Sequence, residues 1–60
     1  MFKIIMVVQG RVIPMPKDFN LGLFEACERA DLYAKRNRDA AFFVMNEENG
    51  DIEYETSMEG

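Results

Sequence analysis

The sequence predicts a small α+β domain in which one helix packs on one face of a small antiparallel sheet, in the order β-β-α-β-β. The chain begins and ends with pairs of β-prone segments, and each pair is joined by a turn that contains glycine, at Gln9-Gly10 and at Asn49-Gly50. Between the pairs lies an amphipathic segment, residues 21–38, whose apolar side chains recur at helical spacing. Short turns make the strands of each pair neighbours, and one such helix covers one face of the sheet.

Length and composition indicate one small domain with a minimal core. The chain has 60 residues, 48% of them hydrophobic and 30% charged, and a chain of this size buries only about 60% of the surface that its unfolded form exposes. With a single cysteine, Cys27, and no histidine, neither a disulfide nor a cysteine–histidine metal site can reinforce the fold. We expect one domain over residues 1–56, a frayed tail at 57–60, and self-association as a route to stability.

The first pair of segments predicts a hairpin whose second strand lies at an edge of the sheet. Residues 2–8 are rich in β-branched side chains, and the second strand, residues 11–15, contains Pro14 and is followed by Pro16. Proline lacks the amide hydrogen that a central strand must donate, which favours an edge position. A two-residue turn sets three facing pairs: Val7 with Val12, Met6 with Ile13, and Ile5 with Pro14.

Residues 21–38 are predicted to form the helix. Asn20 is a suitable N-cap, with Asp18 as the alternative, and Phe19 and Phe24 occupy the positions of a hydrophobic staple around an Asn20 cap. The predicted inner face is mostly small, which lets the helix lie close to a sheet. Its members are Leu23, Ala26, Cys27, Ala30, Tyr33 and Ala34. Two oppositely charged pairs at i,i+4 support the helix: Glu25–Arg29 and Asp31–Lys35.

The second pair of segments, residues 41–45 and 52–56, is joined around the Asn49-Gly50 hairpin signal. A two-residue loop makes Met45 face Tyr54 and Val44 face Glu55. In this register the side under the helix carries Phe43, Met45, Ile52 and Tyr54. The opposite side carries Phe42, Val44, Glu48, Asp51, Glu53 and Glu55.

The face of the sheet that the helix leaves uncovered is predicted to bind protein. A strand that is solvated on one face alternates apolar and polar side chains, and the first and third strands do not alternate. An apolar patch with a charged rim is typical of interaction surfaces. The predicted partner-binding residues are Ile5, Val7, Val12, Phe42 and Val44, bordered by Glu53 and Glu55. Two alternatives stay open: the C-terminal tail covers this face, or one hairpin register is slipped by a residue.

The residue types that most catalytic sites need are missing, so we expect no enzyme and no cofactor. There is no histidine to act as a general base, and the one serine and one threonine, Ser57 and Thr56, adjoin the expected tail. Neither type of glycine-rich phosphate loop is present. Cys27 is expected to pack as a small apolar residue. No metal site is predicted, because aligning Gly50 with the glycine of a calcium loop puts Met45 at the first ligand position.

The favoured function is a protein–protein interaction module: a homodimer, an adaptor or an inhibitor. All seven basic residues lie in residues 1–40, whereas residues 41–60 hold six acids and no base. The first alternative is a nucleic-acid-binding module that uses Lys35, Arg36 and Arg38 at the end of the helix. The net charge of −4 argues against it. The second alternative is a protein whose acidic face imitates nucleic acid, but its carboxylates are few for such a mimic.

Targeting features are absent from the sequence. The apolar run at residues 1–8 stops at Gln9, well short of the ~20 residues of a membrane span, and it lacks the parts of a signal peptide. We therefore expect a soluble cytoplasmic protein whose partner is a second copy or another protein, and we expect no membrane or small-molecule partner.

Overall fold

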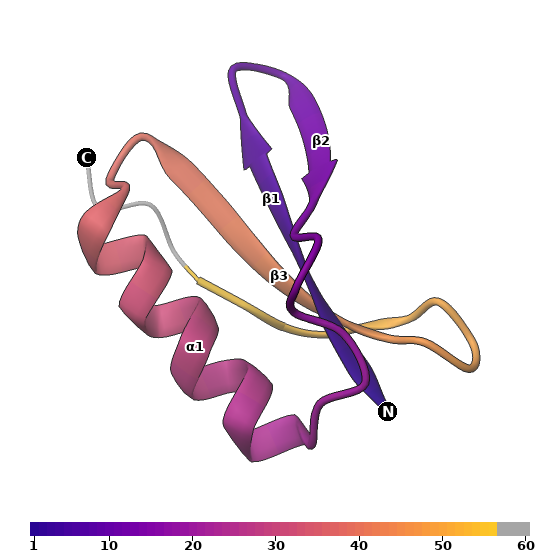
Figure 1. The fold of residues 1–60 in the computed structure, drawn as a ribbon. Coiled ribbons are helices and arrows are strands. Elements are labelled where there is room, and N and C mark those ends of the chain that lie inside the picture. The colour runs from indigo at the N-terminus through magenta and orange to yellow at the C-terminus, as the bar shows by residue number, and fades with distance from the viewer. Residues whose placement is uncertain (57–60) are drawn as a thin grey trace.

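The computed structural model describes residues 1–56, which form a four-stranded antiparallel sheet with one helix on one face (Figure 1). The strands are β1 (Phe2–Val8), β2 (Arg11–Pro14), β3 (Ala40–Asn46) and β4 (Ile52–Glu55), and the helix α1 (Leu23–Arg36) connects β2 to β3. The order across the sheet is β2-β1-β3-β4. The predicted fold class and element order are confirmed. The predicted tail, residues 57–60, lies outside the described residues.

Strand β1 is central and is paired along both of its sides. It pairs with β3 over its whole length, from Phe2 to Val8, and with β2 over its second half. The first half is paired by the segment that leads to α1, because Phe2 and Leu21 exchange two backbone hydrogen bonds of 2.8 and 2.9 Å. The proline-containing strand β2 lies at an edge, as predicted.

The core lies between α1 and the two central strands, β1 and β3 (Figure 1). Ile4, Phe42 and Val44 have no exposed surface, and they pack against the small side chains Ala26 and Ala30 of the helix. Alanine at these two positions lets the helix approach the sheet closely. The predicted small inner face of the helix is confirmed in its centre. At its margin, Leu23 is 45% exposed.

The start of α1 differs from the prediction. Gly22, in extended conformation, is the N-cap residue, and no side chain caps the helix. Asn20 cannot serve because its own φ is positive, at 59°, and the next residue, Leu21, is paired with Phe2 instead of starting the helix. The predicted staple is also wrong, because Phe19 and Phe24 are 58% and 78% exposed. The helix ends at Arg36, where its capping residue donates its backbone N–H to the carbonyl of Tyr33.

The two hairpins differ in how well their registers were predicted. The first has the predicted pairs, Val7 with Val12 among them. In the second, Val44 faces Tyr54, and a bulge separates this pair from Met45 and Ile52. The predicted register is wrong because the connecting turn is longer than two residues. It is closed by hydrogen bonds from Gly50 N to Asn46 O and from Asn46 N to Asp51 O, each 2.8 Å.

Candidate interaction surface

The side of the sheet away from α1 carries a continuous apolar row, which we call the open sheet face. Facing residues of an antiparallel pair lie on the same side of the sheet. The row crosses β2, β1 and β3, because Ile5 of β1 faces Pro14 of β2 on one side and Phe43 of β3 on the other. Val7 faces Val12 on the same side, and Met45 faces Ile52. We define the open sheet face by its apolar members, which are Ile5, Val7, Val12, Pro14, Phe43, Met45 and Ile52; Lys3, which faces Met45, lies on the same side.

Exposure varies across the open sheet face. Ile5 is only 7% exposed because strands flank it on both sides, whereas Val12 and Ile52, on the two edge strands, are 67% and 48% exposed. Phe43 and Met45 are half-buried. A shallow hollow at the β4 edge of this face is lined by Phe43, Ile52, Glu53, Tyr54 and Glu55. The apolar surface left to water is thus concentrated at the two edges.

Two of the predicted partner-binding residues are in the core instead. Phe42 and Val44 lie under α1 with no exposed surface, so they cannot contact a partner. Their neighbours Phe43 and Met45 occupy the open sheet face. Period-2 alternation cannot distinguish the two sets, because residues 41–45 are apolar on both sides. The available signal was the pair of asparagines in the turn, whose side chains accept backbone hydrogen bonds of 2.9 Å and favour a longer turn.

The remaining predicted residues lie on or beside the open sheet face, although Glu53 and Glu55 are not in the predicted register. Ile5, Val7 and Val12 are on the open sheet face. Glu55 faces Phe43 and is exposed, and Glu53 lies at the bulge of β4 and is also exposed. The apolar row therefore has an acidic border along β4.

The two ends of the sheet carry opposite charge. The turn between β3 and β4 contains Glu47, Glu48 and Asp51, all exposed. At the other end, Val8 faces both Arg11 and Ala40, which brings the first hairpin next to the loop that leaves α1. Figure 1 shows this loop and the acidic turn at opposite ends of β3. The basic end carries the exposed side chains of Arg11, Lys35, Arg36 and Arg38, together with the exposed acid Asp39.

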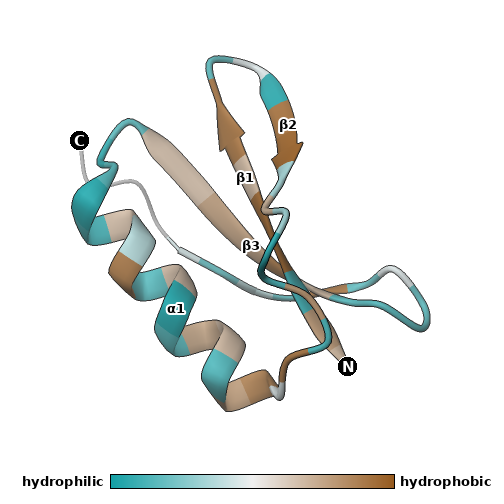
Figure 2. Cartoon of the chain, viewed as in Figure 1, coloured by the Kyte–Doolittle hydropathy of each residue, from teal (hydrophilic) through white to brown (hydrophobic). Residues whose placement is uncertain are grey.

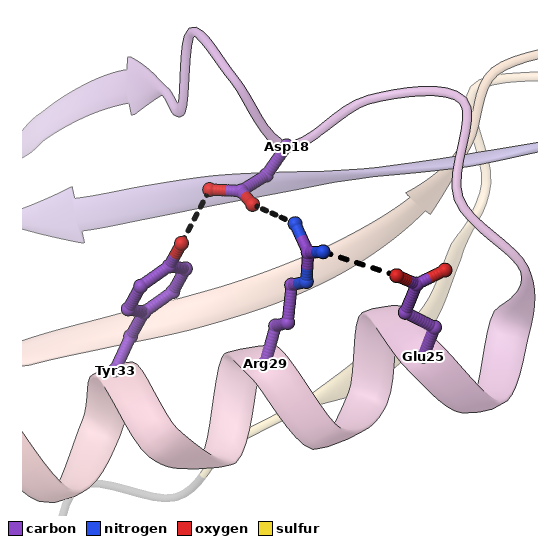
Figure 3. Close-up of polar contacts among 4 residues, drawn as sticks. All are labelled: Asp18, Glu25, Arg29 and Tyr33. Carbon is purple, nitrogen blue, oxygen red and sulfur yellow. Dashed lines mark hydrogen bonds and ion pairs between the residues drawn. The ribbon is translucent and has the colours of Figure 1, made fainter.

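A buried carboxylate fixes the segment that leads to α1 (Figure 3). Asp18 is 3% exposed. One of its oxygens accepts a hydrogen bond from Arg29 Nη1 at 2.9 Å, and the other accepts one from the Tyr33 hydroxyl at 2.7 Å. Arg29 Nη2 also donates to Glu25 at 3.0 Å, which confirms the predicted pair. Each of the four side chains has a hydrogen-bond partner within the cluster, and we assign the cluster a structural role.

A second hydrogen bond, from Tyr54 to Asp31, connects α1 to the sheet. The Tyr54 hydroxyl donates to Asp31 at 2.7 Å and joins β4 to the helix. The predicted ion pair between Asp31 and Lys35 is not found among the described residues. Hydrogen bonding to Asp18 raises the pKa of Tyr33, and hydrogen bonding to Asp31 raises the pKa of Tyr54; burial adds to both shifts.

Cys27 is half-buried. Its pKa is raised mainly by burial and also by the nearby charge of Asp31, which favours the unreactive thiol.

Residues 1–56 show no cluster of three or more side chains that could hold a metal, and α1 is too short and polar to cross a membrane. Comparison with protein-family models, with characterised proteins and with solved structures found no match. The class defined by the fold and the surface is thus a small α+β domain with one uncovered apolar sheet face.

Proposed function

We propose that this chain is a non-enzymatic protein interaction module that binds a second copy of itself through the open sheet face. The observation that carries the proposal is the apolar row across the sheet on the side that α1 does not cover. Burial of apolar surface is worth about 25 cal/mol per Å². Val12 and Ile52, at the two ends of the row, have the most surface to bury.

The small core supports self-association. Its largest fully buried side chains are Phe42, Ile4 and Val44, and a single core in a chain of this length supplies about 3–5 kcal/mol. A standard interface removes about 800 Å² from each partner, roughly a fifth of the 4334 Å² that this chain exposes. Dimerisation through one sheet face would therefore add substantially to the apolar surface that this chain buries.

Charge complementarity supports a second copy as the occupant. A two-fold interface uses the same patch on both copies. If the sheets pack face to face with β3 strands antiparallel, the acidic turn of each copy, with Glu47 and Glu48, lies at the end of the dimer where the other copy has Arg38, in the loop before β3. Opposite potentials of this kind favour association and set its orientation.

Sedimentation equilibrium over a wide concentration range tests the proposal. We expect the wild type to dimerise and Val12→Asp to be monomeric with an unchanged circular dichroism spectrum, since Val12 is 67% exposed on an edge strand. Leu32→Asp is the matched control: Leu32 is 53% exposed on the outer side of α1, and this variant should still dimerise. Raising salt from about 0.05 to about 0.5 M should weaken the dimer by screening its two charged ends.

A monomeric wild type at every concentration would overturn self-association, and equal dissociation by Leu32→Asp would place the interface elsewhere.

Nucleic-acid binding is the second candidate, favoured by the position of Arg11 at the same end as Arg36 and Arg38. Its test is a low-salt titration with a single-stranded oligonucleotide, in which we expect no binding. We further propose that the protein acts in the cytoplasm, a reducing compartment in which its free cysteine would persist.

A further inference from the structure

We infer that this protein has a second binding surface, at the start of α1, which fits a cationic amphipathic segment of another protein. Three large apolar side chains in residues 19–24 are exposed: Phe19 by 58%, Leu23 by 45% and Phe24 by 78%. We call them the helix-start surface. Figure 2 shows hydrophobic colour in parts of the segment that leads to α1 and at the start of the helix, followed by alternating hydrophobic and hydrophilic bands along the rest of α1.

The backbone of the helix-start surface is fixed by contacts at two positions. Asp18 before it and Leu21 within it are both buried, the first bonded to Arg29 and Tyr33 and the second paired with Phe2. Asn20 has a positive φ of 59°, and its backbone N–H donates to Glu47 at 2.6 Å. Phe19 therefore projects from a fixed backbone. A preorganised surface loses less conformational entropy when it binds.

The surroundings of the helix-start surface specify the charge of the partner. Glu25 and Glu28 follow Phe24 on the helix and are exposed, Glu47 is bonded to the backbone of Asn20, and these three acids outnumber the exposed Lys17 that precedes Phe19. The cation of Arg29 is already engaged by Asp18 and Glu25. Exposed aromatic rings also attract lysine and arginine through their faces. Apolar rings with an acidic border therefore fit a segment with apolar residues on one side and basic residues on the other.

This surface is separate from the proposed dimer interface. Leu23 and Phe24 belong to α1, which packs on the side of the sheet opposite the open sheet face. A dimer formed through the open sheet face would leave Phe24 exposed. The inference therefore stands or falls independently of the proposed function.

Fluorescence anisotropy with two labelled helical peptides tests the inference. One peptide carries leucines on one face and lysines on the other, and the second carries glutamates in place of the lysines. We expect the lysine peptide to bind and the glutamate peptide not to bind. Phe24→Ser should weaken binding by about tenfold or more, and the matched control Leu32→Ser, at the exposed leucine on the outer side of α1, should change it by less than about twofold.

Three results would overturn the inference: no binding of the lysine peptide, equal binding of the glutamate peptide, or an equal loss with Leu32→Ser. Tighter binding to vesicles of anionic lipid than to the lysine peptide would identify a membrane as the partner and would also overturn it. Sedimentation equilibrium of Phe24→Ser distinguishes a failure of this inference from a failure of the proposed dimer. This variant should have the same oligomeric state as the wild type.

Discussion

At the scale of single residues, Asp18 is the most deeply buried polar residue of residues 1–56. Its side chain is almost fully buried, and a buried carboxylate is costly unless its oxygens are hydrogen-bonded. Arg29 and Tyr33 meet this need from α1, while the backbone carbonyl of Asp18 accepts a 2.9 Å bond from Ile4 of β1. One residue thus joins the central strand, the connecting segment and the helix.

Asp18→Asn should lower the free energy of unfolding by about 1–3 kcal/mol, because an NH2 donor replaces one of the two accepting oxygens and Arg29 loses its buried counter-charge. Urea unfolding followed by circular dichroism measures the loss. Glu25→Gln is the matched control: Glu25 binds the same guanidinium, but its side chain is 54% exposed. We expect this change to cost less than about 0.5 kcal/mol. Equal losses in the two variants would contradict the importance of burial.

At the scale of elements, α1 begins without a capping side chain. Gly22 occupies the N-cap position with φ −70° and ψ 157°, a conformation open to any residue, and a side chain there would meet no atom within 4 Å. Aspartate at this position could accept a hydrogen bond from the first turn of the helix. The fold therefore leaves room for a cap that the sequence does not supply.

Gly22→Asp should stabilise the protein by about 0.5–1 kcal/mol, through capping and a less flexible unfolded chain. Thermal unfolding should show a rise in Tm. The contrasting variant is Gly10→Ala, since Gly10 also has an open Cβ direction but a φ of +75°. Alanine at position 10 should cost about 1 kcal/mol. A loss of stability in Gly22→Asp would show that α1 does not begin at Leu23.

At the scale of the whole molecule, two tyrosines connect parts of the chain that are distant in sequence. Tyr33 joins α1 to the segment at Asp18, and Tyr54 joins β4 to Asp31 of α1. Each hydroxyl donates its proton to a carboxylate, so each bond requires the neutral tyrosine. This is why both pKa values are raised above the ordinary value of 10.0.

Stability should therefore decrease at alkaline pH. A group with a raised pKa in the folded state contributes stability that is complete below its unfolded pKa, here 10.0, and is lost as the pH rises through its folded pKa. The tyrosines should contribute constant stability from neutral pH to about pH 9 and progressively less above pH 10. Urea unfolding at a series of pH values measures this loss. The double variant Tyr33→Phe/Tyr54→Phe should remove the tyrosine contribution, and an identical alkaline decline in both proteins would contradict the role of the two bonds.

The sequence by itself determined the features that local interactions control. The order of elements follows from turns and periodicity, and the first hairpin register follows from its two-residue turn at Gln9-Gly10. The edge position of β2 follows from the missing amide hydrogen of Pro14. The small inner face of α1, centred on Ala26 and Ala30, follows from helical spacing. Each of these depends on residues close together in the chain.

Only the tertiary structure decided which side of β3 faces the helix and where α1 begins. Phe42 and Phe43 are equally apolar, so pairing with β1 and the long turn before β4 determine which of them is buried. The start of α1 is set by the pairing of Leu21 with Phe2, which keeps the chain extended past the predicted cap. Both outcomes depend on contacts between residues distant in sequence, and such contacts override local preferences whenever the local pattern favours two answers almost equally.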